Sequence, residues 1–219
     1  MEIVLASRNK KKITEMQALL TELCNTEIKI LSLDDIGYVG DIEEDGESFE
    51  ENAAIKASVP ARMGYFGISD DSGLAVDHLN GAPGIYSARY SGEGATDEKN
   101  NEKLMKEMDG VSNREAAYVS VIAFSAPADK FFGESDDELS AYSSRKSGAE
   151  LKTVAFRGEC RGELLCEYRG NGGFGYDPMF LVHEYERTFA EITQEEKNKI
   201  SHRGKALRSF AKWLNENLE

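Results

Sequence analysis

Hydrophobic and polar residues follow one another along this chain in blocks whose spacing predicts helices interleaved with strands. Residues 2–6 form a short apolar run of the kind that makes a buried strand, and the apolar positions from Ile13 to Leu23 recur at helical spacing. Further strands are predicted over residues 117–124 and 152–157. Helices that alternate with strands indicate an α/β domain.

Four more segments are predicted to be helical. Ser48 begins a Ser-Phe-Glu-Glu capping box and Thr193 begins a Thr-Gln-Glu-Glu one, which predicts a helix running towards Pro60 and a short helix after residue 193. Another helix is predicted around residues 97–108. The last helix carries an apolar stripe that is most simply interpreted as core: Leu207, Phe210, Trp213, Leu214 and Leu218.

Two segments show no helical or strand period. Residues 125–150 are polar and acidic, and we expect a long hairpin loop or a partly disordered insertion there. Residues 157–167 contain two glycines and are expected to form another hairpin. Since no internal repeat or interdomain linker is evident, we expect one domain over residues 1–219.

Composition narrows the classes of partner. The 219 residues, 40% of them hydrophobic, can bury one core, folded as two lobes around a cleft. A formal net charge of −14 argues against nucleic acid, although a few converging Lys and Arg can still bind a small anion. The three cysteines match no zinc spacing and are interpreted as ordinary thiols. No segment is apolar enough for a signal peptide or a membrane span, so we expect a cytoplasmic protein with no membrane partner.

The sequence Asp70-Asp71-Ser72-Gly73 is the strongest candidate for chemistry. It follows an apolar stretch at residues 66–68, so both acids fall at the end of a predicted strand. Adjacent carboxylates in that position suit a bound Mg²⁺ and a positioned water. Asp and Gly also favour turns, so a solvated turn is the alternative from this segment alone.

Residues 7–12 connect the first strand to the first helix. Such a turn presents free backbone N–H groups at a helix N-terminus, and hydroxyl, amide and ammonium donors beside them predict a triphosphate-binding loop. The alternative is a solvated, basic start of a helix. The candidate residues are Ser7, Arg8, Asn9, Lys10, Lys11 and Lys12.

Acidic residues precede and begin the second predicted helix. Their carboxylates could complete a Mg²⁺ site with Asp70. For Glu50 and Glu51, a favourable interaction with the helix dipole is the better interpretation. The residues concerned are Glu43, Glu44, Glu47, Glu50 and Glu51.

A glycine-rich segment at residues 170–178 resembles a dinucleotide fingerprint only superficially, because Pro178 interrupts the expected run into a helix. We interpret it as a flexible wall that exposes Phe174 for stacking on a base. Core packing is the alternative for its aromatic residues, and we assign Tyr176 to the core.

A second group of donors lies near the start of the last helix. Lys197 precedes the adjacent pair His202 and Arg203, which stands beside Gly204. These side chains can donate hydrogen bonds to a carbonyl or a phosphate. For any one of these residues alone, the alternative is an exposed side chain with no role in binding.

Together, these segments resemble the Ham1-like family of inosine triphosphate pyrophosphatases, in the family's order. The matching segments cover most of the chain: residues 4–10, 44–57, 70–77, 81–90, 172–178 and 200–206. The resemblance implies an elongated, two-lobed α/β fold with a mixed, twisted sheet and flanking helices, an active-site cleft between the lobes, and a homodimer. It also implies Mg²⁺-dependent hydrolysis of ITP, dITP and XTP to monophosphate and pyrophosphate, which would cleanse the nucleotide pool.

The resemblance also implies roles for individual residues. Asp70 matches the catalytic residue and a metal ligand, and Glu43 matches the other metal ligand, with Glu44 as its rival. In the mechanism that this implies, Asp70 holds or deprotonates the attacking water, and Lys12 and Lys197 offset charge on the leaving pyrophosphate. The substrate-binding residues would be Ser7, Arg8, Asn9, Lys10, Lys11, Lys12, Asp71, Phe174, Gly175, Tyr176, Asp177, Lys197, His202 and Arg203.

Two features depart from the family pattern. Lys11 stands where the family usually has glycine, and residues 125–150 are longer and more acidic than expected. They support one alternative, a non-catalytic nucleotide-binding module. A pyrophosphatase for other nucleotides such as dUTP is a second alternative, which only a panel of substrates separates from the first interpretation.

Overall fold

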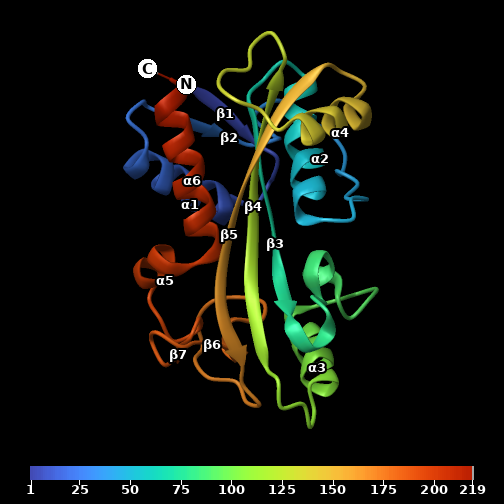
Figure 1. The fold of residues 1–219 in the computed structure, drawn as a ribbon, viewed down its shortest axis with the longest axis vertical. Helices are drawn as coiled ribbons and strands as arrows, with labels where there is room; N and C mark the ends of the chain where they lie inside the picture. Colours follow the sequence, from blue (N-terminus) through green and yellow to red (C-terminus); the bar gives the residue numbers. More distant parts are fainter. Residues whose placement is uncertain (219) are drawn as a thin grey trace. The chain divides into compact units, whose positions relative to one another are not determined.

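A computed structural model describes residues 1–218 of the chain. Its strands form one mixed sheet of seven, in the order β2-β1-β3-β4-β5-β6-β7 (Figure 1). The strand β1 pairs in parallel with β2 and β3, whereas β6 pairs antiparallel with β5 and β7. The strands are β1 (Glu2–Leu5), β2 (Lys29–Leu31), β3 (Gly67–Val76), β4 (Glu115–Pro127), β5 (Leu151–Leu164), β6 (Phe180–Val182) and β7 (Arg187–Thr188).

Helices flank this sheet, so the predicted α/β class with a mixed sheet is confirmed. The α-helices are α1 (Lys10–Leu23), α2 (Phe49–Arg62), α3 (Asp97–Glu107), α4 (Asp137–Ser147), α5 (Gln194–Ile200) and α6 (His202–Asn217). Short 3₁₀ helices are η1 (Asp77–Leu79), η2 (Gly84–Arg89) and η3 (Asp177–Met179). Both predicted capping positions are confirmed, because the side chains of Ser48 and Thr193 accept hydrogen bonds from the first turns of α2 and α5.

The chain forms two compact units, and each has its own hydrophobic core. Unit 1 comprises residues 1–71, 121–157 and the chain from Lys205 on, and its core packs α1 and α6 against β1 and β4. Phe124 is fully buried in it among aromatic rings that include Phe66 and Phe210, so the apolar stripe of the last helix is confirmed as core.

Unit 2 comprises residues 72–120 and 158–204. Its core gathers α3 with the remaining parts of β3, β4 and β5 and with the segment around β6. Tyr118 and Phe180 meet edge to face at its centre, with ring centroids 4.8 Å apart. No helix among residues 1–218 is long and apolar enough to cross a membrane.

The prediction of a loop or partly disordered insertion at residues 125–150 is wrong, because this segment contains the helix α4. Asp136 caps its first turn, Gly148 ends it in a left-handed conformation, and the helix packs along α2 (Figure 1). Its buried face is polar rather than apolar: Ser140 Oγ accepts a hydrogen bond from the backbone of Thr153 at 2.9 Å. A helix held by hydroxyl groups has no apolar period to reveal it.

The hairpin predicted at residues 157–167 is also wrong, because β5 continues without a turn to Leu164. Gly162 does not bend the chain but lets β6 come close. A Cβ at this position would lie 2.2 Å from the carbonyl oxygen of Leu181. The glycine therefore serves strand packing, which a sequence cannot distinguish from turn formation.

Candidate active site

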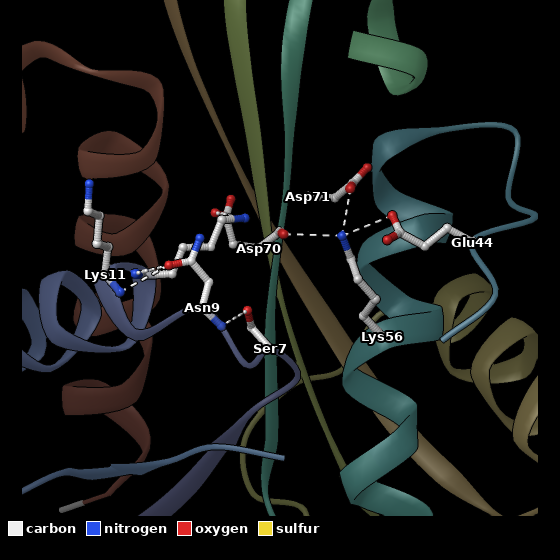
Figure 2. A network of polar contacts seen from close by, with 8 residues as sticks. Ser7, Asn9, Lys11, Glu44, Lys56, Asp70 and Asp71 are labelled. Atoms are coloured by element: carbon white, nitrogen blue, oxygen red, sulfur yellow. Dashed lines mark hydrogen bonds and ion pairs between the residues drawn. The ribbon is translucent and has the colours of Figure 1, made fainter. Parts of the chain in front are cut away.

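The turn from β1 into α1 has the form of a capped helix start. Asn9 Oδ1 accepts hydrogen bonds from the backbone N–H groups of Lys11 at 3.0 Å and Lys12 at 3.3 Å (Figure 2). Ser7 Oγ accepts one from the N–H of Asn9 at 3.1 Å. The predicted helix N-terminus is confirmed, but several of its N–H groups are already bonded within the turn. An anion would bind there beside, or in exchange for, these side chains.

The basic residues of this turn point to different places. Lys12 Nζ lies 3.2 Å from Asp70 Oδ2, so it joins the acidic residues of β3. Lys10 and Lys11 are exposed, and the side chain of Lys11 extends away from Asp70 (Figure 2). Its side chain therefore does not crowd the turn, although it replaces the usual glycine.

Arg8 is engaged with a neighbouring loop. Its guanidinium donates to Asp34 Oδ1 and to the carbonyl oxygens of Tyr38 and Gly40, each at 2.9 Å. In this arrangement Arg8 holds the loop after β2 against the turn, with its donors directed to protein rather than to a ligand.

A buried lysine organises the acidic residues. Lys56 Nζ, on α2, donates to Asp71 Oδ1 at 2.6 Å and to Glu44 Oε2 at 3.1 Å (Figure 2). It also donates to the backbone carbonyl of Asp70 at 3.2 Å. The side chains of Asp70 and Asp71 are 1% and 11% exposed, so these two carboxylates are nearly shielded from water. We call Glu44, Lys56, Asp70 and Asp71, with Lys12, the acidic cluster.

The close approach of α2 to β3 depends on glycine. A Cβ at Gly67 would lie 2.2 Å from the backbone oxygen of Ala57. Small residues of α2 are buried nearby, including Ala53 and Ala54, and the carbonyl oxygen of Ala53 accepts a hydrogen bond from Ser69 Oγ of β3 at 2.6 Å. Close packing of this kind brings Lys56 within hydrogen-bonding distance of the strand that carries both aspartates.

Charge is unbalanced within the acidic cluster, which holds three carboxylates and two ammonium groups. Burial raises the pKa of Asp71 to about 6, in spite of its ion pair with Lys56. Burial alone would lower the pKa of Lys56, but the charges of Asp71 and Glu44 outweigh it and raise that pKa. Lys56 therefore stays charged at neutral pH, while an added cation would relieve the excess of negative charge.

This cluster suits a hard divalent cation. Asp71 Oδ2 is buried and has no hydrogen-bond partner among residues 1–218, so it is an oxygen available to a cation. Mg²⁺ prefers carboxylate oxygens and usually takes only one or two from the protein, with waters and substrate phosphates completing its shell. Glu44 belongs to the cluster, whereas Glu43, the predicted ligand, is exposed.

A second set of potential metal ligands lies in unit 2. Within residues 1–218 it is the one group whose three ligand atoms all fall within 4.8 Å of one another. Its members are Glu115, Glu163 and His183. Each is at least partly exposed, and surface carboxylates are common without a metal.

The glycine-rich loop of unit 2 is built around one buried carboxylate. Asp177 is 1% exposed, and its Oδ2 accepts hydrogen bonds from Lys197 Nζ at 2.6 Å and from the N–H of Phe174 at 3.0 Å. Gly173 has φ +77°, and a Cβ there would lie 2.2 Å from Asp177 Oδ2. The loop can fold over Asp177 only with glycine at this position.

The side chain of Phe174 projects from this loop and is exposed, as the sequence predicts. Its side chain is 57% exposed, and Lys197 Nζ lies 4.9 Å from the centre of its ring. The next residue, Gly175, is held by its N–H to Asp97 Oδ2 at 2.7 Å and by its carbonyl to Asn101 Nδ2 at 3.0 Å. A fixed backbone thus presents a free aromatic face.

Tyr176 points the other way and is buried, which confirms its assignment to the core. Its hydroxyl donates to the carbonyl oxygen of Ser87 at 2.8 Å. His202, the first residue of α6, is 6% exposed, and Arg203 beside it is half-buried. Unit 2 therefore supplies an exposed ring together with imidazole, guanidinium and ammonium donors.

Comparison with known proteins decides the family. A family model described as the Ham1 family matches residues 3–213. The chain belongs to the Ham1 family. It is 42% identical to a protein from Desulfotalea psychrophila named dITP/XTP pyrophosphatase, over 99% of this chain and 89% of that protein. A protein of the same name from Geobacter sulfurreducens is 45% identical over 94% of this chain and 92% of its own.

Comparison with solved structures leads to the same family. The Ham1 proteins of Staphylococcus aureus and Coxiella burnetii each superpose with a TM-score of 0.82 over 99% of both chains, at 35% and 38% identity. The fold of this chain is therefore the Ham1 fold throughout its length.

Sequence reasoning missed one member of the acidic cluster of this Ham1 protein. Lys56 lies inside one of the segments that resemble the family, but no motif marks it as a site residue. The available indication is a single lysine among small and apolar residues on a helix that is buried almost all round. A buried lysine needs an acidic partner, and Asp70-Asp71 is the acidic pair on the strand that follows α2 in the chain.

Proposed function

We propose that this Ham1 protein hydrolyses dITP, ITP and XTP to the monophosphate and pyrophosphate. The observation that carries the proposal is the acidic cluster, where Asp70 and Asp71 are buried together with Lys56 and lie beside the partly exposed Lys12. Carboxylates can hold a cation and a water, and ammonium groups can neutralise a triphosphate. The name of the curated relatives supports the choice of substrate.

The turn before α1 is assigned to the triphosphate. Ser7, Asn9 and Lys12 offer a hydroxyl, an amide and an ammonium group at a helix N-terminus, where the helix dipole also favours an anion. The exposed Lys10 and Lys11 add positive charge without close contact. Arg8 acts indirectly, by fixing the loop that borders the turn.

Mg²⁺ fits the oxygen atoms of Glu44 and Asp71, with Asp70 beside them, and we assign Glu44 in place of the exposed Glu43. When bound, Mg²⁺ would offset negative charge on the triphosphate. The buried ammonium of Lys56 keeps the carboxylates in place, because it bonds to both Glu44 and Asp71.

Asp70 is assigned to the attacking water. Its carboxylate accepts the water proton while the water oxygen bonds to the α-phosphorus, and the bond from that phosphorus to the bridging oxygen breaks to release pyrophosphate. Lys12, 3.2 Å from Asp70 Oδ2, is placed to offset charge on the leaving group. Lys197 is bonded to Asp177 and lies over the Phe174 ring, so we assign it to base binding instead of the leaving group.

Unit 2 is assigned to the base. Phe174 offers a face for stacking, and His202 and Arg203 offer donors to the 6-oxo group of hypoxanthine or xanthine. Adenine carries a 6-amino donor at that position, which would leave a protein donor unsatisfied at a cost of roughly 1–3 kcal/mol. Selection against ATP follows from the sense of these hydrogen bonds.

The decisive experiment measures pyrophosphate release from ITP, dITP, XTP, GTP, ATP and dUTP, with and without Mg²⁺. We expect Mg²⁺-dependent release that is largely confined to the first three. Release mainly from dUTP would favour a pyrophosphatase for other nucleotides. Binding of ITP without release would favour a non-catalytic nucleotide-binding module.

Two further properties belong to the same proposal. A role in cleansing the nucleotide pool implies a cytoplasmic enzyme, and the Ham1 resemblance implies a homodimer. Light scattering on the purified protein tests the second, with a mass twice the 24.3 kDa of one chain as the expected result.

A further inference from the structure

A buried tyrosine lies behind the residues assigned to the base. Tyr118, on β4, is 7% exposed and belongs to the core of unit 2. Its ring lies almost parallel to the imidazole of His202, with centroids 4.8 Å apart and planes 11° apart. Phe189 stacks near it at 5.4 Å and Phe180 meets it edge-on at 4.8 Å. The ring of Tyr118 is therefore fixed, and it fixes the plane of His202 in turn.

The hydroxyl of the same tyrosine reaches the other half of the base site. It donates a hydrogen bond to Asp177, the carboxylate around which the Phe174 loop is folded. Burial, and then the negative charge of Asp177, raises the pKa of Tyr118 well above its usual value. The hydroxyl thus keeps its proton at neutral pH and remains a donor.

Asp177 accepts from three different sources: the hydroxyl of Tyr118, Lys197 Nζ and the backbone N–H of Phe174. A carboxylate that is 1% exposed depends on such donors, because it has almost no contact with water. Loss of one donor should let Asp177 turn, and the Phe174 loop should follow it.

We propose that Tyr118 is a positioning residue for base recognition in this protein. Its ring orients His202 and its hydroxyl orients Asp177, so one side chain sets both a hydrogen-bond donor for the base and the loop that carries the stacking ring. This inference rests on the proposed function. It assigns a role in specificity to a residue that, by its position in a buried strand, would otherwise count only as core.

The test separates the hydroxyl from the ring. Tyr118→Phe keeps the stack on His202 and removes the hydrogen bond to Asp177. Tyr185→Phe is the matched control, because Tyr185 packs at the edge of the same core and carries no role in the site. We expect the first variant to raise KM for ITP about 10-fold, as for loss of a hydrogen bond to a buried charge, with kcat little changed and the preference for ITP over ATP reduced. The control should match the wild type.

A second measurement follows His202 directly. The chain has three histidines, so His78 and His183 serve as internal references in a proton–carbon NMR spectrum of the imidazoles. Titration of the wild type with IMP should shift the His202 and Tyr118 ring signals together. Tyr118→Leu, which removes the ring current, should move the His202 signal and leave the other two histidines unchanged.

The outcomes distinguish this inference from the proposed function. If the wild type hydrolyses ITP but Tyr118→Phe matches it in KM and in preference, or loses only kcat, the positioning role is overturned and the proposed function stands. An IMP titration in which other signals show binding but those of His202 and Tyr118 stay unmoved also overturns it. If the wild type binds ITP without hydrolysing it, the proposed function falls, and the binding constants of the same variants still decide the role of Tyr118.

Discussion

The side chain of Asp70 is only 1% exposed, and burying a carboxylate costs free energy, so its position in the fold needs an explanation. Asp70 has an ammonium group 3.2 Å away on Lys12, and that lysine is itself only partly exposed. An ion pair of this kind holds the orientation of the acid, but it adds little to stability once desolvation is counted. The arrangement is therefore better explained by chemistry than by folding.

Substitution of this residue tests that explanation. Asp70→Asn keeps the shape of the side chain and removes its charge, so we expect kcat for ITP to fall by about 10²-fold or more, as for loss of a general base. Asp77→Asn is the control, since Asp77 pairs with Arg161 in unit 2. Pyrophosphate release and the thermal midpoint are measured on both. Near-normal turnover by Asp70→Asn would rule out its catalytic role.

Two adjacent glutamates offer an unusually well matched comparison. Glu44 is bonded to Lys56 in the acidic cluster, and Glu43 is exposed. Because Mg²⁺ affinity depends on the number of carboxylate oxygens that reach it, Glu44→Gln should raise the Mg²⁺ concentration for half-maximal rate about 10-fold or more, and Glu43→Gln should change it little.

The rise in thermal midpoint on adding Mg²⁺ gives a readout that does not depend on turnover. It should shrink in Glu44→Gln and persist in Glu43→Gln. The reverse order would return the metal site to Glu43, the position that the sequence resemblance favours.

At the scale of elements, the loop before η3 combines a fixed backbone with an exposed ring. The loop needs glycine at position 173 for two reasons. The φ of this residue is +77°, and a side chain would overlap Asp177. Ordinary residues adopt such a backbone only with strain.

Gly173→Ala should therefore displace the Phe174 loop and raise KM for ITP about 10-fold or more, the effect expected when a buried carboxylate loses its partners. Gly110→Ala is the control, because Gly110 has a similar φ of +70° and open space where its Cβ would be. The two variants share the backbone strain, so a difference in KM isolates the clash with Asp177. Equal KM values would show that the loop is not fixed by this contact.

Elements with an apolar period were predictable from the sequence, and those held by polar contacts were not. The helix α1 shows its buried face through Met16 and Leu20, whereas α4 is anchored by Ser140 and Ser143, which have no such period. The site divides in the same way. Asp70 was predictable because its motif is local, but the partners of Lys56 and Tyr118 come from other elements and appear only after packing.

At the scale of the whole molecule, the net charge of −14 makes stability depend on how each acid is placed. Several exposed or partly exposed acids have lowered pKa values through hydrogen bonds and nearby cations, among them Glu2, Asp35, Asp45 and Glu196. A lowered pKa contributes stability above the value of the unfolded chain, and this stability is lost as pH falls through the folded value. These acids therefore weaken the fold only in strong acid.

Asp71 acts in the opposite direction. Burial raises its pKa to about 6, so the folded protein holds a proton that the unfolded chain has already released between about pH 4 and pH 6. Its contribution is complete below the unfolded value and is lost as pH rises through the folded one. The two groups of acids together predict greatest stability of the metal-free protein near pH 5, with a decline towards neutral pH on the order of 2–3 kcal/mol from Asp71 alone.

Urea unfolding in EDTA at pH 4.5, 6 and 7.5 tests this balance. Asp71→Asn cannot release a proton, so its stability relative to the wild type should increase steadily with pH across this range, even though the substitution weakens the contact with Lys56. Asp137→Asn, whose side chain is 94% exposed, should follow the wild type at every pH. A constant difference between Asp71→Asn and the wild type would mean that Asp71 is ionised in the fold as readily as in water. The excess charge of the acidic cluster would then have to be offset by groups other than the proton on Asp71.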